Sequence, residues 1–252
     1  MSGGQVRREH VQDGYDVRLE WGREGVALLG PHCAVLVIVD VLSFCTAVDV
    51  AVERGAAVLP LPWDDERAVD AAARVGALLA GERHTHGLSL SPTSLREIPA
   101  GTRLALPSPN GSALCALAQR GGAHVLAGCL RNAAAVARTA QRLARGGPIG
   151  LVPAGERWTL AGQPMRPALE DVVGAGAVAA VLPGAFSPEA ELAAAQFSAA
   201  RSRGLHGVLA ASSSGRELAT DGFTADITLA AAHDSSDAAP HLQNGFLVGH
   251  AS

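Results

Sequence analysis

Lysine is absent from this sequence of 252 residues, and all 20 of its Lys-plus-Arg residues are arginine. The chain therefore cannot form a lysine Schiff base or supply the lysine of a phosphate-binding P-loop. Any bound anion has to be held by arginine, by backbone N–H groups or by a metal. The four cysteines show no Cys-x-x-Cys spacing, which predicts buried, reduced thiols rather than a zinc site or disulfides.

An excess of basic residues and a long apolar run are also missing. The net charge of -4 and a pI near 6.1 argue against nucleic acid or an anionic membrane as the partner, so a small molecule is expected. No apolar run is long enough to span a bilayer, and residues 1–16 lack the apolar core of a signal peptide. These features predict a cytoplasmic protein.

The chain is rich enough in apolar residues, at 48%, to bury a full core. Strand-like and helix-like segments alternate along most of it, which predicts an α/β fold with a mostly parallel sheet covered by helices on both faces. We expect one domain over residues 1–252, or two closely packed halves that meet near residues 146–150. We expect a helix from Asp64 or Asp65 to about Leu79, and one or two helices over 187–221. Residues 223–232 and 244–250 are expected to be late strands, or a strand and a helix.

Polar residues gather where the predicted strands 34–42, 102–108, 123–130 and 148–154 end. Because ligands collect beyond the carboxyl ends of parallel strands, these loops are candidates for one shared site. The residues concerned are Asp40, Ser43, Cys45 and Thr46 after the first strand, Asn110 and Gly111 after the second, Arg131 and Asn132 after the third, and Glu156 after the fourth.

Glu170 and Asp171 occupy the first turn of a predicted helix that begins near Pro167. Together with Asp40 they form an oxygen-rich set that suits Mg²⁺, which is usually held by one or two carboxylates, waters and substrate phosphate oxygens. Each residue also has a simpler explanation. Acids are preferred at any helix start, and asparagine is a common helix cap.

Several common hydrolase patterns are missing. No cysteine is followed by arginine at the spacing of the cysteine phosphatases, and no second aspartate lies two residues after Asp40, as in dehalogenase-type phosphatases. The motifs G-x-S-x-G, H-E-x-x-H and G-x-G-x-x-G do not appear in the required setting.

The segments VIVDVLSFCTAV, PSPNGSAL, GCLRNAAAVA, VPAGERW and RPALEDVVGAGAV, in this order, resemble the 2-phosphosulfolactate phosphatase family. The resemblance extends through SGRELATDGFTADITLAA and covers about residues 15–240. It implies a three-layer α/β/α fold, Mg²⁺ dependence, and hydrolysis of 2-phospho-3-sulfolactate to sulfolactate and phosphate on the route to coenzyme M.

Carried over by position, the resemblance assigns functional roles to residues of four motifs. These are Asp40, Asn110 with Gly111, Arg131 with Asn132, and Glu170 with Asp171. Many members have arginine where this chain has Ser43, and serine where it has Cys45. If that arginine grips an anion, Arg131, Arg157 or Arg166 would have to replace it.

The working hypothesis is a Mg²⁺-dependent phosphatase of a small acidic phosphomonoester. Asp40, Asn110 and Arg131 are the expected catalytic residues, and Asp40, Glu170 and Asp171 the expected metal ligands. The substrate would contact Ser43, Cys45, Thr46, Gly111, Asn132 and Glu156.

Two alternatives stay open. The chain is a catalytically silent member that binds a small anionic metabolite, or it is another kind of hydrolase with Cys45 as nucleophile. A homodimer is the expected assembly.

Overall fold

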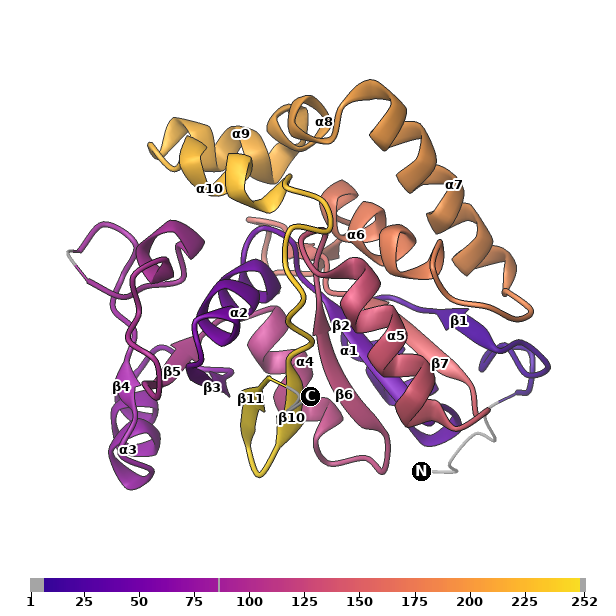
Figure 1. Ribbon diagram of the computed structural model, residues 1–252, viewed down its shortest axis with the longest axis horizontal. Coiled ribbons are helices and arrows are strands. Elements are labelled where there is room, and N and C mark those ends of the chain that lie inside the picture. The colour runs from indigo at the N-terminus through magenta and orange to yellow at the C-terminus, as the bar shows by residue number, and fades with distance from the viewer. Residues whose placement is uncertain (1–6, 86, 250–252) are drawn as a thin grey trace.

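The sheet is mixed, and the last strands of the chain form its middle. In the computed structural model, which describes residues 7–85 and 87–249, nine strands are ordered β1-β7-β2-β6-β10-β11-β3-β5-β4 (Figure 1). Their bounds are Val17–Leu19 (β1), Val35–Val39 (β2), Ala57–Leu61 (β3), Leu78–Leu79 (β4), Arg103–Pro107 (β5), His124–Gly128 (β6), Ile149–Pro153 (β7), His241–Gln243 (β10) and Phe246–Val248 (β11). A separate antiparallel pair joins Glu156–Arg157 (β8) to Met165–Arg166 (β9).

Ten α-helices and two short 3₁₀ helices lie within the described residues. The α-helices are Gly22–Leu29 (α1), Phe44–Glu53 (α2), Glu66–Arg74 (α3), Gly111–Ala118 (α4), Ala133–Ala144 (α5), Leu169–Ala179 (α6), Pro188–Arg203 (α7), Leu205–Ala211 (α8), Ser213–Thr220 (α9) and Thr224–Ala230 (α10). The 3₁₀ helices are Gly30–His32 (η1) and Pro92–Leu95 (η2).

Strand β2 is buried on both faces, which explains its unbroken run of branched apolar residues. Because successive side chains of a strand point to opposite faces, Val35, Val37 and Val39 pack with α5, α6 and α7. Leu36 and Ile38 pack with α1, α2 and α4 on the other face. The predicted three-layer α/β/α fold is therefore confirmed.

Two blocks of parallel strands are joined by the antiparallel hairpin β10–β11. Strands β1, β7, β2 and β6 are parallel to one another, and so are β3, β5 and β4. The pairs β6/β10, β10/β11 and β11/β3 are all antiparallel. Three successive reversals give the second block the opposite sense along the sheet, so the sheet is mostly parallel but mixed.

Most predicted elements are present, with two differences in extent. Helix α3 ends at Arg74 rather than near Leu79, because Gly76 has a positive φ of 63° and the chain then enters β4. Residues 188–220 form three helices instead of one or two. The segment 223–232 contains α10 and 246–248 is β11, which matches the expectation of a helix and a strand.

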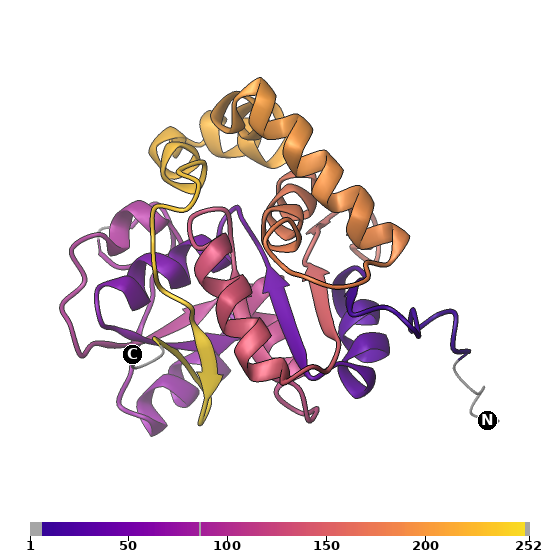
Figure 2. The same cartoon turned by 45° about the vertical axis from the view of Figure 1, so that its right-hand side comes forward.

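Helices α7 to α10 form a layer that crosses one end of the molecule above α6 and α2 (Figures 1 and 2). Beneath this layer, α6 lies close against β2: a Cβ built on Gly174 would be 2.9 Å from Val39 Cγ1 in β2 and 2.6 Å from Val41 Cγ2 just after it. The close approach brings the first turn of α6 to the end of β2. Within residues 7–85 and 87–249, no helix combines the length and the apolar character needed to cross a membrane.

Candidate active site

Asp40 is the first residue after β2, and backbone N–H groups from two helix starts hold its side chain. Oδ1 accepts a hydrogen bond from Phe44 N at 3.1 Å, and Oδ2 accepts one from Gly111 N at 2.9 Å. A Cβ on Gly111 would lie 2.8 Å from that same Oδ2, so only glycine lets α4 begin so near the carboxylate. The carboxylate is 5% exposed and fixed between α2 and α4.

Glu170 and Asp171, in the first turn of α6, lie beside Asp40. Asp171 Oδ1 accepts from Val41 N at 2.8 Å, and its Oδ2 accepts from Gly155 N at 2.9 Å, so this residue ties the loops after β2 and β7 together. Glu170 is equally buried, but its Oε2 has no hydrogen-bond partner within the described residues. A buried carboxylate oxygen without a partner is costly, which points to a ligand that binds there.

Burial, and then repulsion between these acids, raise their proton affinities. Burial, and next the charge of Glu156, raise the pKa of Asp40 to about 7, although the N–H groups of Gly111 and Phe44 act in the opposite direction. Burial, Asp40 and Glu170 raise the pKa of Asp171 well above its usual value. Four carboxyl groups thus lie close together at this edge, an arrangement that a bound cation would stabilise.

Asn110 and Glu156 face each other across the same edge. Asn110 makes no side-chain capping bond to α4; instead its Nδ2 donates to Glu156 Oε1 at 2.7 Å. Glu156 lies in the ribbon β8–β9, where Arg166 is its cross-strand neighbour. The loop after β5 therefore reaches the ends of β2 and β7 even though β5 belongs to the other strand block.

Three residues after Asp40 are predicted by the sequence to contact the substrate. One of them bonds to a side chain of another loop, and the other two bond to backbone carbonyl groups. Ser43 Oγ accepts from Arg83 Nη2 at 2.9 Å. Cys45 Sγ donates to Ile38 O at 3.3 Å, and Thr46 Oγ1 donates to Val41 O at 2.7 Å. Burial raises the pKa of the Cys45 thiol well above its usual value, which disfavours Cys45 as a nucleophile.

Arg131 and Asn132 are engaged elsewhere. Arg131 donates through Nε to Asp49 at 2.7 Å and through Nη2 to Glu53 at 2.9 Å, both on α2. Asn132 Oδ1 accepts from Cys129 N at 2.8 Å and so closes the turn after β6. Asp49 and Glu53 lie in the second half of α2, away from Asp40, and Arg131 is bound there. The structure therefore does not place Arg131 and Asn132 among the four acids.

The order and content of these loops match a known family. Residues 29–245 match the family model described as 2-phosphosulpholactate phosphatase. The chain belongs to this family. It is thereby a phosphatase, that is, a phosphoric monoester hydrolase.

Sequence reasoning missed Arg83, which lies beside the site of this 2-phosphosulpholactate phosphatase family member, in the loop between β4 and η2. Its guanidinium bridges Ser43 and Asp226, with Nη1 at 3.0 Å from Asp226 Oδ2. Asp226 lies on α10, and the charge of Asp40 also acts on Arg83. The only available signal was an arginine in the Gly-bounded segment GERHTHG, which does not reveal partners 40 and 143 residues away.

The two remaining arginines proposed to compensate for Ser43 differ in position. Arg166 donates to the buried Ser214 on α9 at 3.1 Å and stays partly buried beside β8. Arg157 is exposed and reaches Pro109 O at 3.3 Å. Arg157 lines the same cavity as Asn110 and Glu156, whereas the Arg166 guanidinium is bonded to α9, so Arg157 is the better placed of the two to meet a ligand there.

Three cavities lie around this edge. One of about 200 Å³ is lined by Asn110, Glu156 and Arg157, and one of about 500 Å³ by Arg83, Ser108 and Pro109. Pro109 belongs to both, so they meet at the loop that carries Asn110.

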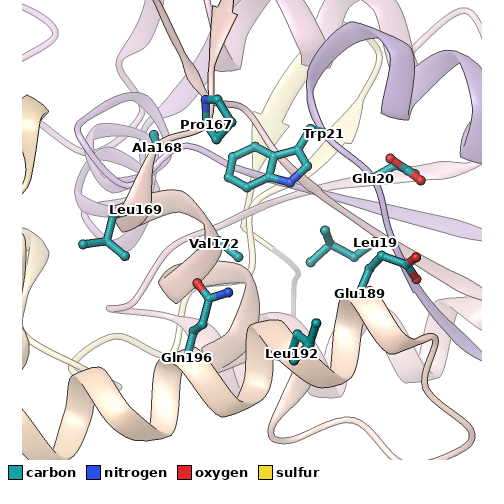
Figure 3. Close-up of a pocket in the computed structure, with 10 residues that line it drawn as sticks. All are labelled: Leu19, Glu20, Trp21, Pro167, Ala168, Leu169, Val172, Glu189, Leu192 and Gln196. Carbon is teal, nitrogen blue, oxygen red and sulfur yellow. The ribbon is translucent and has the colours of Figure 1, made fainter.

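The third cavity, of about 450 Å³, lies on the outer side of α6. Figure 3 shows Trp21 and Pro167 on one wall, with Leu192 and Gln196 from α7 on the other. Its only charged lining residues, Glu20 and Glu189, are acidic and would repel phosphate. The phosphate site is therefore better placed at the other two cavities.

The acid cluster offers the carboxylate oxygens that a hard cation prefers, but within the described residues it does not supply a complete set of metal ligands. Within the described part of the chain, no three His, Cys, Asp or Glu residues form a group that could hold a metal ion by themselves. Mg²⁺ needs only one or two protein carboxylates, because waters and phosphate oxygens complete its octahedron. The unpartnered Oε2 of Glu170 and the raised pKa values of Asp40 and Asp171 are consistent with such a cation.

Proposed function

We propose that this phosphatase is Mg²⁺-dependent and hydrolyses a small acidic phosphomonoester, 2-phospho-3-sulfolactate or a close relative. The observation that carries the proposal is the group of Asp40, Glu170, Asp171 and Glu156, in which one Glu170 oxygen has no partner among the described residues. Family membership supplies the reaction class, and the acid cluster supplies the reason for a divalent cation.

In this proposal one or two of Asp40, Glu170 and Asp171 bind the cation directly and the rest through water, since no three acids of the described residues form a complete site. Glu170 offers its unpartnered oxygen, while the oxygens of Asp40 and Asp171 each accept one N–H bond and keep a second lone pair. The bound ion would neutralise phosphate charge and lower the pKa of a bound water.

Other residues position the reacting groups. The Gly111 N–H is already used by Asp40, so Gly111 serves to fix the carboxylate. Asn110 holds Glu156 with one N–H of its amide and keeps its other N–H for a phosphate oxygen. Arg157, which lines the same cavity as Asn110 and Glu156, adds positive charge for the phosphate.

A turnover assay with defined esters tests the proposal. We expect Mg²⁺-dependent hydrolysis of 2-phospho-3-sulfolactate or a phosphorylated hydroxy acid, lost in EDTA and restored by Mg²⁺. Asp40→Asn should abolish most of it, whereas Asp70→Asn, at an exposed position of α3, should not. No turnover of any ester by the wild type, or full activity in Asp40→Asn, would contradict the proposal.

The second candidate is a silent member that binds an anionic metabolite, and Ser43 in place of the common arginine favours it. Thermal-shift measurements with sulfolactate, with and without Mg²⁺, separate the two. Binding without turnover of any ester would support the silent member.

A further inference from the structure

Arg83 connects three distant segments at the border of the proposed site. Its guanidinium contacts Ser43 on the loop after Asp40 and Asp226 on α10, and it lines the cavity of about 500 Å³. Its side chain is 20% exposed, so part of it faces solvent while the rest is enclosed. Such a cation at a cavity wall is able to meet an anion from solution.

We propose that Arg83 is the specificity-determining residue that binds a second acidic group of the substrate, a carboxylate or sulfonate, and that Asp226 is its positioning residue. The proposal rests on the proposed function, since the phosphate is taken to lie over the acid cluster. It deepens that function by naming the group that selects esters with a second negative charge.

The geometry leaves Arg83 free to bind. Arginine carries five N–H donors in a planar fork, and the two contacts described occupy only part of it. Phe223 lies under the guanidinium, with its ring 5.4 Å from Cζ, which restricts the fork to one plane. A planar, oriented fork suits a carboxylate or sulfonate better than a mobile ammonium group would.

Asp226 is built to hold this fork in place. It is 1% exposed, and besides Arg83 its carboxylate accepts hydrogen bonds from Ser91 Oγ at 2.7 Å and Thr93 N at 3.1 Å. Residues from α10 and η2 therefore converge on one carboxylate that orients Arg83. Since this carboxylate is enclosed, its contribution to binding has to act through the arginine.

The cavity also determines where the second anion can sit. Asp64 and Glu82 line it as well, and both are exposed. Their charges would repel an anion at the cavity mouth. The favourable position is therefore close to Arg83 and to the Ser108–Pro109 wall, on the side nearest Ser43.

Kinetics with two esters test the inference: 2-phospho-3-sulfolactate, which has a carboxylate and a sulfonate besides its phosphate, and p-nitrophenyl phosphate, which has neither. In Arg83→Gln the first ester should bind more weakly: its KM should rise roughly 10- to 100-fold, the loss typical of a charge-assisted hydrogen bond, with kcat little changed. The KM for the second ester should stay the same. Asp226→Asn should shift the KM for the first ester in the same direction by less, and Arg74→Gln, on the exposed face of α3, is the matched control.

Removing Arg83 leaves the buried Asp226 without its ion-pair partner, which could unfold the single variant. The double variant Arg83→Gln/Asp226→Asn replaces the ion pair with a neutral pair, so that KM can be measured on folded protein. An equal rise in KM for both esters, or no rise for either, would overturn the inference. If the wild type hydrolyses no ester, the proposed function fails. The role of Arg83 is then tested separately, by calorimetric measurement of the binding of phosphate-free 3-sulfolactate to the wild type and to Arg83→Gln. Binding that Arg83→Gln weakens supports it; binding that is absent or unchanged overturns it.

Discussion

Two groups of carboxylates are each centred on a buried aspartate, Asp40 or Asp49, and they differ in what neutralises them. Around Asp40, four acids lie close enough to repel one another, and Glu170 Oε2 has no hydrogen-bond partner within the described residues. Asp49 Oδ1, in the second group, has none among them either, so the two groups differ in charge and not in unpartnered oxygens. Around Asp49, on α2, the guanidinium of Arg131 bridges Asp49 and Glu53 at 2.7 and 2.9 Å. One group carries its own counter-charge and the other does not.

This difference is the one we expect between a structural cluster and a cluster that binds a cation. A buried acid that is paired with arginine stabilises its surroundings only as long as both partners remain. A cluster of like charges destabilises the empty protein, and it is favourable only when a cation or substrate occupies it. Substitutions around Asp40 should therefore lower activity more than stability, and substitutions around Asp49 should lower stability more than activity.

The largest expected effect is on activity in the first cluster. Asp40→Asn should lower kcat/KM by roughly 10²- to 10⁴-fold, the range for loss of an essential acid or base. The free energy of unfolding, measured in urea without Mg²⁺, should change little, because relief of one like charge offsets the N–H bond from Phe44 or Gly111 that the amide NH2 cannot accept. A stability loss as large as the loss expected for Arg131→Met would contradict the comparison.

In the second cluster the main effect should be on stability. Arg131→Met leaves Asp49 buried and uncompensated, and should lower the free energy of unfolding by about 3–5 kcal/mol. Activity per folded molecule should be retained. Arg138→Met is the control, because Arg138 and Asp237 form an exposed pair whose loss should cost about 0–1 kcal/mol. Loss of activity in fully folded Arg131→Met would restore Arg131 to the active site.

The pH dependence of stability sharpens the comparison. Burial, despite the attraction of Arg131, raises the pKa of Asp49 to about 6 from an unfolded value of 3.8. Between these values the folded chain binds more protons than the unfolded chain, so this group's contribution to stability falls as pH rises from about 4 to 6.

Urea unfolding of wild type and Asp49→Asn at several pH values should show this decline in their difference. One pKa unit corresponds to about 1.4 kcal/mol, so the decline is at most about 3 kcal/mol. A difference that rises over the same window would mean that Arg131 outweighs burial.

The smallest effect should appear at Glu170. Glu170→Gln removes a negative charge with little change in shape, so the melting temperature without Mg²⁺ should stay the same or rise slightly. Added Mg²⁺ should raise the melting temperature of the wild type by a few degrees, since a ligand stabilises the state that binds it, and should raise that of Glu170→Gln less. The same Mg²⁺-induced shift in both proteins would show that Glu170 is not a ligand.

The sequence was informative where local patterns decide structure. The apolar run before Asp40, the glycine after Asn110 and the acids at the start of α6 predicted elements that the structure contains, and their loops converge as expected. Glu156 also reaches this edge. These residues all lie in or next to the turns that follow strands, where short-range patterns are strongest.

Contacts between distant segments could not be predicted. Arg131 follows a strand end as Asp40 does, but acids spaced four residues apart on α2 bind it instead. Arg83 and Asp226 meet only because α10 folds back over η2, which no local pattern indicates. The reversed sense of β3 and β5 depends in the same way on a hairpin from the end of the described chain.

That hairpin governs how the molecule is assembled. Within the described residues, His241–Gln243 and Phe246–Val248 form the only backbone ladder between the two strand blocks. During synthesis these residues follow the other described strands of the sheet. Until they pair, the edge strands β6 and β3 lack backbone hydrogen-bond partners on the side where the hairpin binds. Continuity of the sheet, and with it the mutual placement of the β2 and β5 loops, is completed by the two strands that come latest in sequence among the nine described.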